Sequence, residues 1–242
     1  MKKKILIIAT AVILLALATY GTLAWFTDTD KVKNVFVIGS IEIEQHEVFD
    51  EQTAQLLPVV DNANPAASNM IQKEVTVENV GENDAYIQVL VAVPAVLDNT
   101  GVVHIYDGLT SDNWAKVDGD TATVDVIDPV YKDVSVEGET LKYNIYIYRY
   151  KGAIAKGFTT DKAIQGVYID QTVDSDHVVV NGTERYVFVT GDAAKDALLK
   201  EFDAAGKLNV YVATQAIQAA NFASADEALT KGFTTPVPIT AE

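Results

Sequence analysis

The most suggestive chemistry in the chain begins at position 46. His46 and Glu47 match the first half of HExxH, a helical motif whose two histidines bind zinc in many peptidases. Position 50 is Asp50, so the second histidine is missing. Residues 41–45 alternate between apolar and polar types as a strand does, and a strand would place positions 46 and 50 too far apart to share a metal ion. We therefore expect a surface histidine beside solvated acids, and no catalytic zinc.

Aspartate clusters supply the other candidate ligands. Asp118 and Asp120 form one cluster, and Asp170, Asp174 and Asp176 form another; both offer hard oxygen atoms that could hold calcium. Neither has the spacing of a calcium-binding loop, so we predict solvated turns and no cofactor, with calcium left open as the alternative. The chain has no cysteine and no G-x-S-x-G, P-loop or dinucleotide-binding motif. We therefore predict no catalytic, cofactor-binding or metal-ligating residue and no enzymatic activity.

The charge of the chain is strongly negative. Eighteen lysines and arginines stand against 34 aspartates and glutamates, which gives a formal net charge of −16. Such a chain repels phosphate backbones, so nucleic acid is excluded as a partner. Like charge also opposes self-association unless a specific contact or a bound cation overcomes it.

The first 24 residues are predicted to be a signal helix and not part of the fold. Three lysines follow Met1, and the apolar run of residues 5–18 is 14 residues long, whereas a bilayer span needs about 20. Cleavage between Ala24 and Trp25 would leave small side chains at Thr22 and Ala24, as signal peptidases require. Because residues 5–26 carry no charge, an uncleaved anchor is the alternative. We expect membrane contact only through this segment before cleavage.

The remainder of the chain is predicted to be mainly strands. The odd positions of residues 85–93 are all apolar, as in a half-buried strand, and Pro94 should end it. Residues 143–150 alternate in the same way, with three tyrosines on one face. Asn181-Gly182 lies between two further runs and predicts a hairpin. The spacing of these strands favours one antiparallel β-sandwich over residues 45–242.

Helix signals are few. Asp192 is a candidate N-cap for a helix that carries Leu198 and ends near Gly206. Ser224 is a candidate N-cap for a shorter helix that Gly232 should close. We therefore expect one or two short helices beside the sandwich.

Residues 25–44 form an unusually apolar segment directly after the predicted cleavage site. Left exposed, this segment would be an aggregation-prone edge. It could fold back as a strand of its own sandwich, or it could fill a groove in a neighbouring subunit by strand addition. The second arrangement makes head-to-tail contacts that do not close, and therefore a fibre. The residues predicted to act in assembly are Trp25, Phe26, Val35, Phe36, Val37, Ile38, Ile41 and Ile43.

Three groups of residues resemble one known family. Residues 24–30, AWFTDTD, are followed by FVIGSIEI at 36–43; residues 77–87 read VENVGENDAYI; and AIQAANF at 216–222 precedes ADEA at 225–228. These stretches are similar to the A-x-F-[ST]-D junction, the F-x-x-G-x-[IL]-x-[IL] strand, the V-x-N-x-G-x-x-x-A-Y-[VI] stretch and the ending of the TasA/camelysin family. Trp25 departs from the family pattern, and the chain after Gly232 matches no part of it.

The resemblance implies a jelly-roll-like sandwich in a secreted protein of the cell surface or extracellular matrix. It also implies a subunit of biofilm fibres that donates its N-terminal strand to the next copy. The implied partners are further copies of the chain, a SipW-type signal peptidase and other matrix proteins. Two alternatives stay open: a camelysin-like secreted or cell-surface metallopeptidase, for which His46 and Glu47 would be the only candidates, and a surface accessory protein that does not polymerise.

Overall fold

The computed structural model describes residues 41–49, 57–108, 112–117, 122–126, 141–180, 183–201 and 210–233. The predicted signal helix of residues 1–24 and most of the predicted donor segment lie outside these residues. Among the described residues, no helix is long and apolar enough to cross a membrane.

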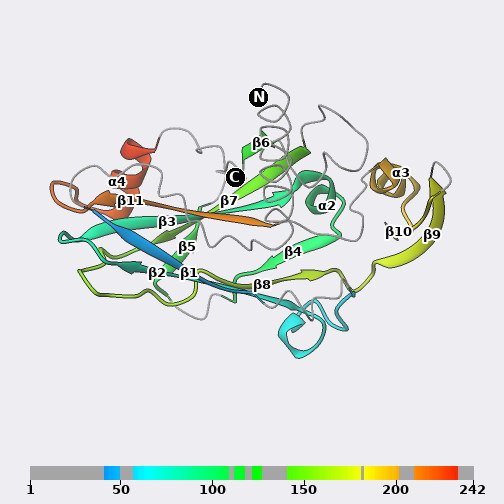
Figure 1. Cartoon of the computed structure of the whole chain (residues 1–242), viewed down its shortest axis with the longest axis horizontal. Helices are drawn as coiled ribbons and strands as arrows, with labels where there is room; N and C mark the ends of the chain where they lie inside the picture. Colours follow the sequence, from blue (N-terminus) through cyan, green and yellow to red (C-terminus); the bar gives the residue numbers. More distant parts are fainter. Residues whose placement is uncertain are drawn as a thin grey trace, which may run out of the picture. The chain divides into compact units, whose positions relative to one another are not determined.

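Two antiparallel sheets make up most of the described chain (Figure 1). The first has four strands in the order β1-β2-β8-β4, and the second follows the order β11-β3-β7-β5 with β6 also paired to β7. The four-stranded sheet consists of β1 (Ile43–Phe49), β2 (Ile71–Asn79), β8 (Ile164–Ile169) and β4 (Val103–Tyr106). The five-stranded sheet consists of β11 (Tyr211–Gln218), β3 (Ala85–Pro94), β7 (Leu141–Tyr150), β5 (Trp114–Lys116) and β6 (Ala122–Val126).

A separate hairpin follows β8 in the chain. Strands β9 (Asp174–Val180) and β10 (Thr183–Val189) pair in antiparallel register with Val180 opposite Thr183. The two strands flank Asn181-Gly182 in the sequence, so the predicted hairpin pairing is confirmed; the turn residues themselves lie outside the described residues.

Both predicted helices are present, and their N-caps are as expected. The Asp192 carboxylate accepts hydrogen bonds from the backbone N–H groups of Ala194 and Lys195 at the start of α3 (Ala193–Glu201). The Ser224 hydroxyl accepts from the backbone N–H of Glu227 in α4 (Ala225–Gly232). The sequence did not predict two further elements, the short helix α2 (Ala95–Asn99) and the 3-10 turn η1 (Pro65–Ala67). The predicted end of the first helix near Gly206 lies outside the described residues.

One continuous cluster of buried side chains joins the two sheets. It contains the odd positions of β3 that the sequence predicted to be apolar, together with Val75 and Val77 of β2 and Ile164 of β8. Tyr148 and Tyr150 of β7 belong to the same cluster, and Tyr146 packs against it. The predicted tyrosine face of this strand therefore lies against the core between the sheets.

The outer face of the five-stranded sheet is also buried, which the sequence did not indicate. Leu90 and Ala92 of β3 pack with Tyr143, Ile145 and Ile147 of β7 in a second cluster. The prediction that β3 is half-buried is therefore wrong, because the strand is buried on both faces. Helix α4 packs elsewhere on this sheet, against Ile217 of β11 and Tyr86 of β3. The predicted mainly β, antiparallel class is confirmed. The jelly-roll connectivity and the domain limits at residues 25–44 and 45–242 stay predictions.

Candidate metal centre on strand β1

Strand β1 occupies one edge of the four-stranded sheet, with β2 as its only neighbour among the described strands. Of the residues predicted to act in assembly, Ile41 and Ile43 are described. They are 2% and 4% exposed and belong to the core between this chain's own sheets. The other predicted assembly and cleavage residues lie outside the described residues; they are Ala24, Trp25, Phe26, Val35, Phe36, Val37 and Ile38.

His46 and Glu47 point to opposite faces of β1. Side chains alternate along the strand, so Ile43, Gln45 and Glu47 turn inward while His46 turns to solvent. Glu47 forms an ion pair with Lys73 of β2, whose ammonium also lies 5.1 Å from the centroid of the Phe49 ring. Two side chains on opposite faces of a strand cannot act on one metal ion, so this pair does not form the zinc site of an HExxH peptidase. The prediction of a surface histidine beside acids is confirmed.

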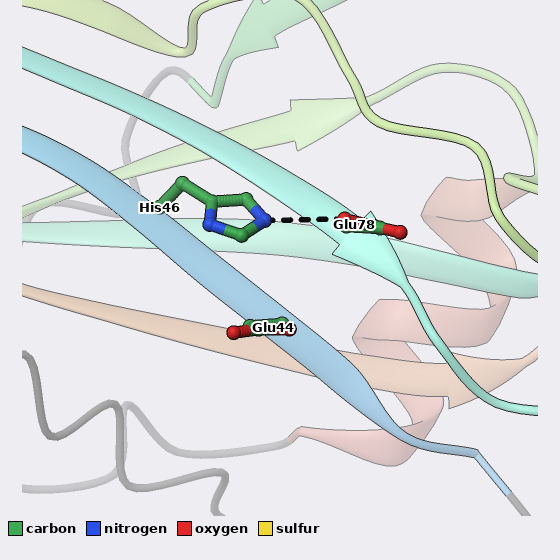
Figure 2. A group of neighbouring side chains, drawn as sticks. All are labelled: Glu44, His46 and Glu78. Atoms are coloured by element: carbon green, nitrogen blue, oxygen red, sulfur yellow. Dashed lines mark hydrogen bonds and ion pairs between the residues drawn. The ribbon is translucent and has the colours of Figure 1, made fainter.

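The acids that lie beside His46 come from two strands. The register of β1 and β2 places Glu44 directly opposite Glu78 and His46 opposite Thr76, so His46 is the diagonal neighbour of Glu78. His46 Nε2 lies 3.2 Å from Glu78 Oε2, and one ligand atom each from Glu44, His46 and Glu78 lie within 4.8 Å of one another. Figure 2 shows the imidazole directed at Glu78, with Glu44 further along the same strand as His46.

The cluster of Glu44, His46 and Glu78 concentrates negative charge, and no lysine or arginine of the described part of the chain is paired with it. Carboxylates directly opposite each other on paired strands repel. Elsewhere on these strands Glu47 is paired with Lys73, and Glu74 is paired with Lys162 at 2.7 Å. Among the described residues, the recorded partner of Glu78 is His46, and Glu44 has no lysine or arginine partner. The cluster is therefore the part of the described β1–β2 surface where a cation would relieve the most repulsion.

The donor set fits a transition-metal ion better than calcium. Imidazole nitrogen and carboxylate oxygen are both zinc ligands, and three protein ligands with an open position are common where zinc stays accessible to solvent. In a tetrahedral zinc site, ligand atoms about 2.1 Å from the ion lie about 3.4 Å apart. The His46–Glu78 distance of 3.2 Å already meets this, and rotation of the exposed Glu44 side chain would complete the set. Calcium needs six to eight oxygen ligands, which these three residues do not supply.

The predicted aspartate clusters are used within the fold. Asp170 holds the segment before β2 to β4, because it accepts a hydrogen bond from Asn62 at 2.7 Å and lies 3.1 Å from His104 Nε2. Partial burial favours the protonated carboxyl, but hydrogen bonds from Thr172, Asn62 and His104 lower the pKa of Asp170 to about 2. Asp174 and Asp176 are exposed and accept hydrogen bonds from the backbone N–H groups that follow them. They lie on strand β9, so the prediction of a turn is wrong for these two residues. Asp118 and Asp120 lie outside the described residues.

Sequence reasoning found His46 but not its partners. Glu44 shares a face with His46 by simple alternation, and this could have been noticed. Glu78 is 32 residues from His46 in the sequence and is brought there by strand register, which no local pattern indicates.

These features define a mainly β protein with antiparallel sheets and a three-residue candidate cation site on an edge strand. A model of the family described as camelysin metallo-endopeptidase matches residues 1–101, which include β1, β2 and all three residues of the candidate site. Over these residues the chain is similar to the camelysin family, which supports the resemblance to the TasA/camelysin family. No curated protein matches the chain.

Proposed function

We propose that this protein is a secreted structural subunit of extracellular or biofilm matrix fibres, which polymerises head to tail by donating its N-terminal strand to the neighbouring subunit. The observation that carries the proposal is the position of β1. Strand β1 begins at Ile43, within the last two residues of the apolar segment 25–44, and it lies at a sheet edge with one described neighbour. An edge strand leaves a row of backbone N–H and C=O groups available for pairing with another chain.

In this proposal the apolar segment has two parts with different roles. Ile41 and Ile43 pack in the core of their own subunit and anchor the segment. Residues 25–38, with Trp25, Phe26 and the run from Val35 to Ile38, are the donated part. A side chain such as Phe36 gains about 2 kcal/mol when it is buried in a neighbour's groove, which favours assembly over leaving the segment in water.

Export and partners follow from the same proposal. Residues 1–24 would direct secretion, and a SipW-type signal peptidase would cut after Ala24 to release the donor segment. The protein would then reside in the extracellular matrix or at the cell surface, with further copies of itself and other matrix proteins as partners.

Electron microscopy of the purified exported protein tests the proposal. The wild type should form filaments, and the double variant Phe36→Ser/Ile38→Ser should remain monomeric because its donor strand has lost two apolar anchors. The matched control Lys31→Ser/Lys33→Ser alters neighbouring polar positions and should still polymerise. Filaments of the first variant equal to those of wild type would refute strand donation. A wild type that stays monomeric under all salt conditions would favour the non-polymerising accessory protein.

A camelysin-like metallopeptidase is the second candidate, favoured by the family description and by the donor set at Glu44, His46 and Glu78. This function requires chelator-sensitive cleavage of a protein substrate such as casein. The cleavage activity should be lost in Glu78→Gln. It should be retained in Glu82→Gln, since Glu82 lies on the turn after β2 and pairs with Lys156. Cleavage that is insensitive to chelator, or equal in both variants, would exclude this site as a peptidase centre.

A further inference from the structure

We propose that Glu44, His46 and Glu78 bind one zinc ion that fastens the edge strand β1 to β2. The ion would have a structural role, in contrast to the catalytic role that the metallopeptidase candidate gives to the same residues, and the inference does not depend on whether the protein forms fibres. Its ligands come from two strands, so the ion would connect β1 to its only described neighbour.

The geometry of paired strands accounts for the three ligands. Glu44 and His46 are two positions apart on β1 and therefore project from the same face. Glu78 faces Glu44 across the strand pair, and its carboxylate already contacts the imidazole. The side chains of His46 and Glu78 are 44% and 31% exposed, so an ion can enter from solvent and water can fill its remaining position.

Two separate observations favour a cation here. The first is the mixed donor set, because an imidazole nitrogen beside two carboxylates selects zinc over calcium and magnesium. The second is the charge pattern, because among the described residues this facing glutamate pair has no lysine partner, whereas Glu47 and Glu74 each have one. Bound zinc would replace repulsion between Glu44 and Glu78 with attraction of both to one ion.

The consequence is a stabilised edge. A ligand that binds the folded strand pair and not its opened form lowers the population of the opened form. Zinc should therefore slow amide hydrogen exchange in β1 and in the paired part of β2, while the β9–β10 hairpin, which pairs with neither strand, should be unaffected.

Calorimetric titration of the purified full chain with Zn²⁺, Ca²⁺ and Mg²⁺ tests the assignment. We expect one Zn²⁺ per chain and at least tenfold weaker binding of the other two ions. His46→Gln, Glu44→Gln and Glu78→Gln should each weaken zinc binding about tenfold or more, the loss that even outer-shell changes at metal sites produce. Glu42→Gln removes the same charge from the same face of the segment, two positions before Glu44, and His177→Gln removes an exposed histidine from β9; both should bind zinc as wild type does.

Hydrogen exchange supplies the second measurement. Zinc should increase protection of residues 43–49 in wild type and in Glu42→Gln, and it should have no effect on them in His46→Gln. The inference is overturned if wild type binds no zinc, if zinc binding is unchanged in His46→Gln and Glu78→Gln, or if bound zinc leaves exchange in β1 unaltered. Weak binding of all three ions that Glu42→Gln reduces as much as the three ligand variants do would also overturn the inference. Such binding would reflect only the acidic surface.

Discussion

The Thr214 hydroxyl of β11 donates a buried hydrogen bond of 2.6 Å to Gln45 Oε1 of β1, and so joins the edge strands of the two sheets. Gln45 lies between Ile43 and Glu47 on the inward face of β1, so its side chain reaches into the space between the layers. This contact holds β1 to the opposite sheet, in addition to its backbone pairing with β2.

Thr214→Val should therefore destabilise the protein by about 1–2 kcal/mol, because the shape is kept while the buried Gln45 oxygen loses its donor. Urea unfolding measures the change. Thr76→Val is the control: this threonine lies half-buried on β2, and its side chain forms no hydrogen bond with another described residue. Its replacement should change stability by less than about 0.5 kcal/mol. Equal effects of the two variants would show that the Thr214–Gln45 bond contributes nothing.

The features that were predicted correctly from the sequence are set by short-range rules. Alternation in residues 85–93 and 143–150 identified which side chains face the inter-sheet core. Turn chemistry identified the β9–β10 hairpin, and the Asp192 and Ser224 side chains identified two helix starts. Each of these depends on residues only a few positions apart, so one stretch of sequence contains the whole signal.

The features that were missed depend on long-range pairing. Periodicity shows that Glu44 and Glu78 each face outward, but it does not show that they face each other, because register is decided by the whole sheet. In the same way, Glu47 reads as a solvated acid until its inward partner Lys73 is known. Helix α2 was missed because Pro94 was read only as a strand end, although the chain turns directly into a helix after it.

Asp170 should make stability depend on pH in the acid range. Its pKa is lowered to about 2 in the folded protein from a usual value of 3.8, so its stabilising effect is present above about pH 4 and is lost as pH falls through 2. Asp170→Asn mimics the protonated form and should cost about 1–2 kcal/mol at pH 6, with the difference from wild type shrinking toward pH 2.5. Urea unfolding over this pH range measures it.

The control for this prediction is Asp174→Asn, since Asp174 is exposed and its recorded hydrogen bond is from the backbone of the next residue. Asp174→Asn should change the free energy of unfolding little at pH 6 or at pH 2.5. A difference between wild type and Asp170→Asn that stays constant from pH 6 to 2.5 would contradict the lowered pKa.

The N-cap of α4 should contribute about 1 kcal/mol. Ser224 accepts from the backbone N–H of Glu227, and the Glu227 carboxylate accepts from the backbone N–H of Ala223, so the two side chains satisfy donors at the start of the helix. Ser224→Ala should lower the free energy of unfolding by this amount, whereas Ser224→Asp keeps an acceptor and should be nearly neutral. Thermal unfolding distinguishes them, and equal losses would mean that the cap does not stabilise α4.

The Glu47–Lys73 pair should behave as a buried ion pair. Its side chains are 16% and 9% exposed, whereas those of the pair between Glu82 and Lys156 are 73% and 56% exposed. Removing one partner of a buried pair leaves a desolvated charge, so Lys73→Met should cost about 2–4 kcal/mol. Lys156→Met, the matched change at the exposed pair, should cost less than about 1 kcal/mol.

The double variant Glu47→Gln/Lys73→Met separates loss of the pair from loss of packing. If an unpaired buried carboxylate causes the destabilisation, removing its charge should recover at least about 1 kcal/mol, since replacing both members of a buried pair is far less costly than replacing one. Urea unfolding of the wild type, both single variants and the double variant gives the coupling energy. Additive losses would mean that Glu47 and Lys73 are not coupled, and that β1 is held at the sheet edge by backbone pairing and apolar packing alone.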